Sequence, residues 1–253
     1  MLHDGNSLLK LWVVMFVAAG IALGIWRGFF AARKIQPGRF KWKIFRNEAL
    51  IAVVTLAFTG TVLGFGQKWL LAHGWITFAA EPAPLWMIAL EYLTYFVLFD
   101  TWFYWLHRLM HVEPVYKWVH KVHHFSTTPN PLTTLSETPI EGIVNGGFVP
   151  LFLTVFTIHP ATMALILPTN IIMGFYVHSG FEFFPRWWNR TWATKWFITA
   201  TFHDHHHRYF RYNFGGYTTI WDHICGTVRP KFDQDFDRIA GGQARAPKVA
   251  AAA

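Results

Sequence analysis

The chain has 253 residues, of which 53% are hydrophobic and only 14% are charged. Soluble domains carry about 25% charged residues, so this composition excludes an ordinary soluble protein and predicts an integral membrane protein. The net charge is +8, but the basic residues lie between apolar segments, which favours anionic lipid headgroups over nucleic acid as their partner. Cys225 is the single cysteine, which excludes an intramolecular disulfide and a cysteine-held metal cluster.

The apolar segments, taken in chain order, predict about four transmembrane helices. Residues 8–26, 49–71 and 85–105 are each about as long as the hydrocarbon core of a bilayer requires. A fourth apolar region, 143–177, is interrupted by prolines and is long enough for a hairpin of two spans. For the first segment we favour a retained anchor over a signal peptide, because no basic n-region precedes it.

The basic residues predict the orientation of these spans. The 27–46 connection holds seven lysines and arginines, whereas the 72–84 connection holds none. The positive-inside rule therefore places the 27–46 connection in the cytoplasm. By parity, the chain returns to the cytoplasmic side from His107 onward.

Many of the histidines fall in three clusters with regular spacing. The first, HRLMH, is an i, i+4 pair, and the other two, HKVHH and HDHHH, repeat the spacing i, i+3, i+4. Each cluster can point two or three imidazoles the same way from one helical turn. Neutral imidazoles bind first-row transition metals, and eight of them are too many for one ion. With His178 added, the candidate metal ligands are His107, His111, His120, His123, His124, His178, His203, His206 and His207.

These observations predict an all-α, multi-pass integral membrane protein. About four transmembrane helices would carry a cytoplasmic helical cap, and the cap would hold a histidine-rich di-metal site. Spacing alone does not choose among zinc, copper and iron. A hydrolytic HExxH zinc site would need a glutamate beside the histidines, and none of the three clusters contains one.

Acidic residues near the clusters are candidates to fix the imidazole tautomers. Asp100 lies seven residues before His107 on the same helix face, in an apolar segment where an unpaired acid is costly. Asp222 follows a tryptophan, Asp204 lies inside the third cluster, and Glu141 follows the second. Asp100 and Asp222 are the two acids that we place in the catalytic site, in support of the histidines.

The clusters and their flanks resemble the fatty acid hydroxylase/sterol desaturase superfamily of membrane di-iron oxidases. The family's HxxxH, HxxHH and HxxHH boxes match in order. The runs YKWVHKVHH at 116–124, HSGFE at 178–182 and YNFGGYTTIWDHICGT at 212–227 match as well. The resemblance implies that the nine histidines bind two iron ions. It also implies O₂ as co-substrate and a separate electron donor, such as a ferredoxin, a cytochrome b5-like protein or a reductase.

The resemblance covers about residues 92–230 and suggests a division of the chain. Residues 1–91 would be N-terminal transmembrane anchor helices, 92–230 the di-iron catalytic region, and 231–253 a disordered C-terminal tail.

Two positions depart from the family pattern. Thr138 stands where many members have the histidine of an HPxE segment, and Gly174 stands where some carry a second histidine four residues before His178. We therefore expect water or Asn170 to replace a missing ligand. Because Thr138 has lost the family's histidine, we also expect Thr138→Ala to be tolerated.

The function that the resemblance implies is an O₂-dependent monooxygenase of lipid biosynthesis that hydroxylates an unactivated C–H bond. Fatty acyl, sphingoid, sterol-like and aminolipid substrates all stay open. A desaturase on the same irons is the alternative. A non-enzymatic membrane metal transporter or sensor is a third hypothesis. A transporter should place ionisable residues within its spans. Apart from Glu91 and Asp100, the predicted spans are nearly free of such residues. O₂ consumption on reduction separates the enzyme from the transporter.

Overall fold

The computed structural model describes residues 28, 30–36 and 42–242, and within these ranges the chain is helical without a β-strand. The longer helices are α2 (Trp42–Ala72), α3 (Leu85–Met110), α4 (Pro139–Gly146), α5 (Phe148–Val155) and α6 (Pro160–Val177). The smaller C-terminal helices are α7 (Ala200–Tyr209), α8 (Ile220–Ile224) and α9 (Phe232–Ala240). Short helical turns cover Ala31–Arg33, Tyr116–His120, His123–Phe125, Pro131–Leu135 and Trp188–Arg190.

Local sequence signals explain where several of these helices begin. The Thr138 hydroxyl accepts a hydrogen bond from a backbone N–H in the first turn of α4, and the His159 ring does the same for α6. In both helices the next residue is proline, whose fixed φ suits the first helical position. Pro84, in extended conformation, directly precedes α3.

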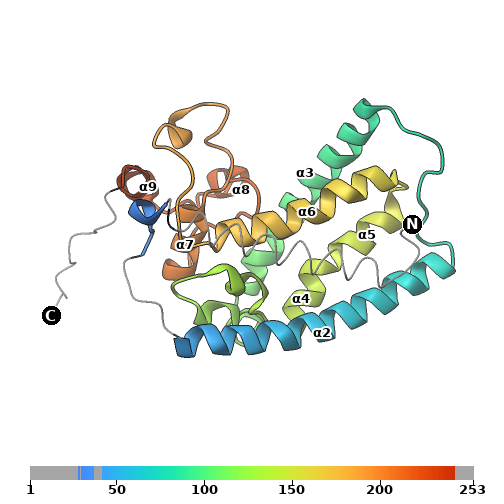
Figure 1. Ribbon diagram of the computed structural model, residues 1–253, viewed down its shortest axis with the longest axis horizontal. Helices are drawn as coiled ribbons and strands as arrows, with labels where there is room; N and C mark the ends of the chain where they lie inside the picture. Colours follow the sequence, from blue (N-terminus) through green and yellow to red (C-terminus); the bar gives the residue numbers. More distant parts are fainter. Residues whose placement is uncertain (1–27, 29, 37–41, 243–253) are drawn as a thin grey trace.

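The long helices run back and forth along one axis (Figure 1). α2 packs against α4 along one side, and α3 packs against α6. At one end, the connections 73–84 and 156–159 meet through a bridge between Phe78 and Ile158. At the other end, where α2 begins and α6 ends, α7, α8, α9 and the 116–135 turns gather. The fold therefore has a helical bundle with a cap at one end.

Among the described residues, two helices are long and apolar enough to cross a membrane, α2 and α6. α3 has 26 residues but is not one of them, and α4 with α5 forms a shorter apolar stretch, Pro139–Val155. The predicted first span, residues 8–26, lies outside the described residues. All-helical architecture and membrane-length helices are thus confirmed at this coarser level.

Two hydrophobic clusters stabilise the bundle and the cap separately. The bundle cluster joins α3, α5 and α6 through buried side chains that include Tyr95, Phe152 and Ile166. The cap cluster joins the end of α6 to α7 and α9, with Phe202 and Phe236 completely buried. Because α7 carries three of the candidate ligands, the cap cluster fixes their helix against the bundle.

The C-terminal tail was predicted to be disordered from residue 231, and this boundary was wrong. Residues 232–240 form α9, and Phe232, Phe236 and Ile239 on one face of it are buried. The hydrophobic spacing of these residues is that of a helix packed on a neighbour. The rest of the predicted tail, from residue 243, lies outside the described residues.

Candidate metal centre

Four segments bring the nine candidate histidines to the cap end of the bundle. α3 supplies His107 at its end and His111 directly after it. The Tyr116–His120 and His123–Phe125 turns carry the second cluster, His178 follows the end of α6, and α7 carries the third cluster. Eight of the nine side chains are buried, and His111 is half-buried.

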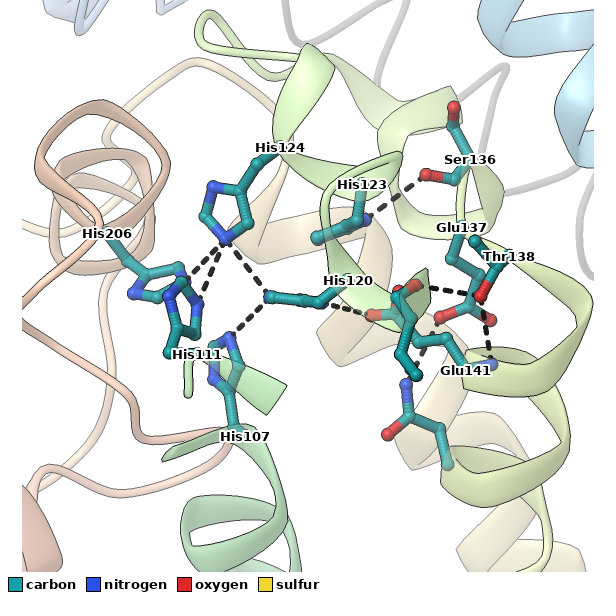
Figure 2. A network of polar contacts seen from close by, with 12 residues as sticks. His107, His111, His120, His123, His124, Ser136, Glu137, Thr138, Glu141 and His206 are labelled. Atoms are coloured by element: carbon teal, nitrogen blue, oxygen red, sulfur yellow. Dashed lines mark hydrogen bonds and ion pairs between the residues drawn. The ribbon is translucent and has the colours of Figure 1, made fainter. Parts of the chain in front are cut away.

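The histidines form two separate groups, within each of which the ligand atoms lie within 4.8 Å of one another. Group A contains His107, His111, His120, His124 and His206, and group B contains His123, His178, His203 and His207. In group A, the Nε2 atom of His124 lies 3.0 Å from that of His120 and 3.2 Å from that of His111 (Figure 2). In group B, the Nε2 atoms of His178 and His203 are 2.9 Å apart.

In each i, i+3, i+4 cluster, two of the three imidazoles belong to one group and the third to the other, within the two or three that the spacing allowed. His120 and His124 contribute to group A, whereas His123 contributes to group B. In α7 the division is reversed, because His206 joins group A while His203 and His207 join group B. Each HxxHH box therefore serves both groups, which ties the two groups to one another.

Hydrogen bonds made by the Nδ1 atoms determine which nitrogen of several imidazoles carries the proton and which presents a lone pair. The Nδ1 atoms of His107, His206 and His178 each lie 2.8 Å from a backbone carbonyl oxygen. A carbonyl only accepts, so each Nδ1 carries the proton and each Nε2 of the neutral ring presents a lone pair.

Lone pairs facing one another make these groups cation sites. His107 and His120 both have an acceptor at Nδ1, and their Nε2 atoms lie only 3.1 Å apart. Two unprotonated nitrogens cannot hydrogen-bond to each other, and at this distance their lone pairs repel. A cation between them converts this repulsion into coordination, so the donor set fits a pair of transition-metal ions.

Burial keeps the imidazoles in the form that binds metal. It lowers the pKa of His123 to about 4 and the pKa of His178 to about 3. Both rings are therefore neutral near pH 7, and no proton must leave before a metal binds.

Glu141 is the acid that contacts a candidate ligand directly. Its Oε1 lies 2.6 Å from Nδ1 of the buried His120 (Figure 2). Thr138 caps the start of α4, the helix that carries Glu141. Its hydroxyl accepts a hydrogen bond from the Glu141 N–H at 3.2 Å and donates one to the Val119 carbonyl at 2.7 Å. Thr138 is thus linked to both ends of the His120–Glu141 pair, and the expectation that it is dispensable loses its basis.

Asp100 and Asp222, the two acids placed in the site from the sequence, contact no histidine of the groups among the described residues. Asp100 accepts from the backbone N–H groups of Tyr217 and Thr218 at 2.9 and 2.8 Å. Asp222 accepts from those of Phe214 and Gly215 at 2.9 and 2.7 Å. Both acids therefore hold the 214–218 loop, and the loop's Phe214 carbonyl in turn accepts from His107 Nδ1. Their support of the site is indirect, which corrects the prediction.

A cavity of about 190 Å³ borders both groups of histidines and extends into the bundle. Its polar lining includes Glu137, Glu141 and Asn145, from α4 and the segment before it. It also includes Asn170 of α6 and Tyr217 of the 214–218 loop. Burial raises the pKa of Glu137 to about 8, and Asn145 donates to this carboxyl at 3.1 Å. The remaining wall is mostly aromatic and aliphatic, including Phe99, Phe103, Met110, Met173 and Val177.

Neither departure from the family pattern is filled by Asn170. The Asn170 side chain hydrogen-bonds to Tyr95 and Tyr217, and no contact with a histidine exists within the described part of the chain. Gly174, the position of the second family histidine, packs directly against Thr134. The expectation that Asn170 replaces a ligand is therefore wrong.

Two buried acids that sequence reasoning did not assign also hold the cap together. Glu48 of α2 accepts from Ser126 and Asn130, in the segment that follows the second histidine cluster. Glu182 accepts from the backbone N–H groups of Phe184 and Thr201, the latter in the first turn of α7, at 3.0 Å each. Glu182 belongs to the HSGFE run, which was the available signal. Glu48 has no such signal, since its partners lie about eighty residues away.

Comparison with known proteins identifies the family. Residues 92–227 match the model of the family described as fatty acid hydroxylase. The C-4 methylsterol oxidase of Schizosaccharomyces pombe is 31% identical over 216 residues, covering 79% of this chain and 67% of that protein.

Two further relatives point the same way. The human cholesterol 25-hydroxylase is 34% identical over 151 residues, which is 59% of this chain and 55% of its own. The Delta(7)-sterol 5(6)-desaturase of Leptosphaeria maculans is 32% identical over 148 residues, 58% of this chain and 39% of its own. The chain thus spans between 39% and 67% of the length of these relatives, and no solved structure matches it. The family match covers more than half of the chain and contains all nine histidines, so the chain belongs to the fatty acid hydroxylase family of oxidoreductases.

Proposed function

We propose that this protein is a membrane di-iron monooxygenase that uses O₂ and electrons from a separate donor to hydroxylate an unactivated C–H bond of a sterol-like lipid. The balanced reaction takes the lipid, O₂, two electrons and two protons to the alcohol and water. The observation that carries the proposal is the convergence of two groups of buried imidazole Nε2 atoms beside one largely apolar cavity.

The site residues have distinct roles in this proposal. The nine histidines would hold two irons, five nitrogens from group A and four from group B. The chemistry that such a pair supplies when bound is the activation of O₂ for attack on a C–H bond. Glu141 and the Phe214 and Tyr212 carbonyls hold the protonated Nδ1 atoms, so each Nε2 lone pair faces inward before any metal arrives.

The cavity orients the substrate and excludes water. Its aromatic and aliphatic wall contacts hydrocarbon, and its inner end is bordered by histidines of both groups. Burial of these histidines keeps bulk water from a strongly oxidising site.

A membrane arrangement with the cap on the cytoplasmic side is part of the proposal. Large apolar side chains stand exposed along the outer face of α3, including Leu85, Trp86, Leu90, Leu93 and Val97. Such a face is unfavourable in water and suits lipid, which supports α3 as a span beside α2 and α6. α2 begins at the cap end of the bundle (Figure 1), and its first turns contain the end of the basic 27–46 stretch, which favours a cytoplasmic cap.

The relatives narrow the substrate class and leave a second reaction open. Several of them carry names that specify sterols, as oxidase, hydroxylase and desaturase, and this supports a sterol-like lipid over the other lipid classes. Desaturation is the second candidate, favoured by the desaturase relative. It would remove two hydrogens and release two waters with the same electron demand.

Metal transport is disfavoured by the partners of the two acids in α3. Glu91 accepts from the His159 N–H at 3.0 Å and from the Thr162 hydroxyl, and Asp100 accepts from the 214–218 loop. Neither acid lines the cavity. An ion pathway would need free ligands along the spans.

Lipid mass spectrometry of cells that express the wild type or His206→Ala tests the proposal. A lipid heavier by one oxygen in the wild type alone supports hydroxylation, and one lighter by two hydrogens supports desaturation. Purified wild type should contain two irons per chain and consume O₂ on reduction, whereas His206→Ala should lose iron but keep its membrane insertion. Full activity of His206→Ala would refute the di-iron assignment.

A further inference from the structure

Asn170, Tyr95 and Tyr217 form a polar cluster inside the bundle. The Asn170 amide nitrogen donates to the Tyr95 hydroxyl at 2.8 Å, and the Tyr217 hydroxyl donates to the Asn170 amide oxygen. Tyr95 and Tyr217 are almost completely buried. Phe96 and Phe99 pack their rings on Tyr217. Polar groups at such depth in a membrane protein are expensive and mark binding sites.

The two members of the cluster that line the cavity have unused hydrogen-bonding capacity. Asn170 and Tyr217 both line the cavity that also borders the histidines. Only one of the two Asn170 N–H groups has an acceptor among the described residues, and the Tyr217 oxygen, which donates its proton to Asn170, has no donor there. The pair therefore presents one free donor and one free acceptor side by side.

We propose that Asn170 and Tyr217 bind a hydroxyl group of the lipid substrate, at a point distant from the carbon that is oxidised. A hydroxyl is the group that can accept from the Asn170 N–H and donate to the Tyr217 oxygen at once. This inference deepens the proposed function and rests on it, because the site of oxidation is taken to be the histidine groups.

The position of Asn170 on α6 sets the spacing between the two points. Asn170 lies eight residues before His178, which directly follows the end of α6, and this corresponds to about 12 Å along the helix axis. The cavity joining them has a volume of about 190 Å³, below the roughly 300–1,000 Å³ of pockets that enclose whole ligands. The cavity thus encloses only the portion of a lipid between the hydroxyl and the oxidised carbon.

Equilibrium binding of two matched sterols tests the subsite directly. The probes are radiolabelled 5α-cholestan-3β-ol and 5α-cholestane, which differ only by the hydroxyl. Each binds to iron-loaded, full-length protein in lipid nanodiscs without reductant, so that no turnover occurs. The wild type should bind the alcohol about tenfold more tightly than the alkane, as expected for a buried hydroxyl that gains its partners.

Substitutions in the cluster should remove this preference. Tyr217→Phe and Asn170→Leu should each reduce it by about five- to tenfold, while binding of the alkane stays unchanged. Tyr92→Phe is the matched control. The Tyr92 hydroxyl contacts Thr169, which lies beside Asn170 on α6, at 2.8 Å, but Tyr92 does not line this cavity. The substitution should therefore leave the preference intact. Equal loss of both probes in Tyr217→Phe would show a purely structural tie between helices and overturn the proposal.

Two further results separate this proposal from the proposed function. Iron-loaded protein that consumes O₂ but binds both sterols equally refutes the hydroxyl subsite alone. Protein that prefers the alcohol but holds no iron refutes the di-iron function and leaves the subsite standing. Once the product is known, oxidation at the carbon next to the hydroxyl would overturn the predicted spacing.

Discussion

The close contact between α6 and the Pro131–Leu135 turn leads to a sharp prediction for Gly174→Ala. A β-carbon at this position would lie 2.5 Å from the Thr134 methyl carbon. Thr134 cannot simply rotate away, because its hydroxyl donates to the Gly174 carbonyl at 2.8 Å and lies 3.2 Å from His178 Nδ1. The substitution must therefore shift the end of α6, and with it His178.

The expected cost follows from overpacking a tight contact. Such substitutions destabilise by about 1–3 kcal/mol. For a chain of this size each kcal/mol lowers the melting temperature by about 2–4 °C, so Gly174→Ala should melt about 6 °C below the wild type. Thr134→Ser provides the rescue, since it removes the colliding methyl and keeps the hydroxyl. In the double variant the side chain at position 134 keeps only its β-carbon and hydroxyl oxygen, which lie 3.8 Å from the β-carbon added at position 174.

Thermal unfolding of the four proteins in detergent measures this coupling as a double-mutant cycle. The double variant should melt within about 2 °C of Thr134→Ser alone, and it should recover the iron content that Gly174→Ala loses. Wild-type stability of Gly174→Ala, or failure of Thr134→Ser to rescue it, would refute the assignment of the contact.

Three further outcomes follow from the site. Glu141→Leu should weaken iron binding about 10- to 100-fold, because the proton on His120 Nδ1 loses its acceptor, whereas Glu141→Gln should weaken it less; equal iron loss to a chelator in both variants would contradict this role. Thr138→Ala should cost about 1 kcal/mol through loss of the helix cap, and Thr138→Ser should restore stability in the same melting assay. The metal-free protein should lose stability as pH falls from about 6.5 to about 4. In the unfolded chain histidines bind protons at a pKa of about 6.5, whereas burial lowers the pKa of His123 to about 4 and that of His178 to about 3 in the folded protein. A melting temperature that stays constant over this range would show that these rings are not buried.

Sequence reasoning located the nine histidines because their spacing and their number are local properties. It did not divide them between two groups, because that division depends on which histidines of other segments each ring faces. The Tyr116–His120 segment is a π-helical turn and His123–Phe125 a 3₁₀ turn. His120 and His123 nevertheless fall in different groups just as His203 and His206 do in the regular helix α7, so in both boxes the i and i+4 rings share one group and the i+3 ring joins the other.

The supporting residues were harder to predict for a related reason. Asp100 was correctly expected to need a partner inside the bundle, but its partners are backbone N–H groups of a distant loop rather than an imidazole. Glu141 was one of four acidic candidates, and only the direction of α4 places it against His120. Long-range pairs of this kind carry no periodic signal in the chain.

The link between Asp100 and the 214–218 loop has a consequence for biogenesis. Of its two backbone N–H partners, the one that comes first in the chain, that of Tyr217, lies 117 residues after Asp100. At about 5–20 residues per second, a ribosome needs roughly 6–25 s to synthesise that interval. During this time Asp100 is without the amide groups that it binds in the finished fold. Synthesis of α3 must therefore precede closure of the cap, and the full set of nine candidate ligands exists only once His207 has been made.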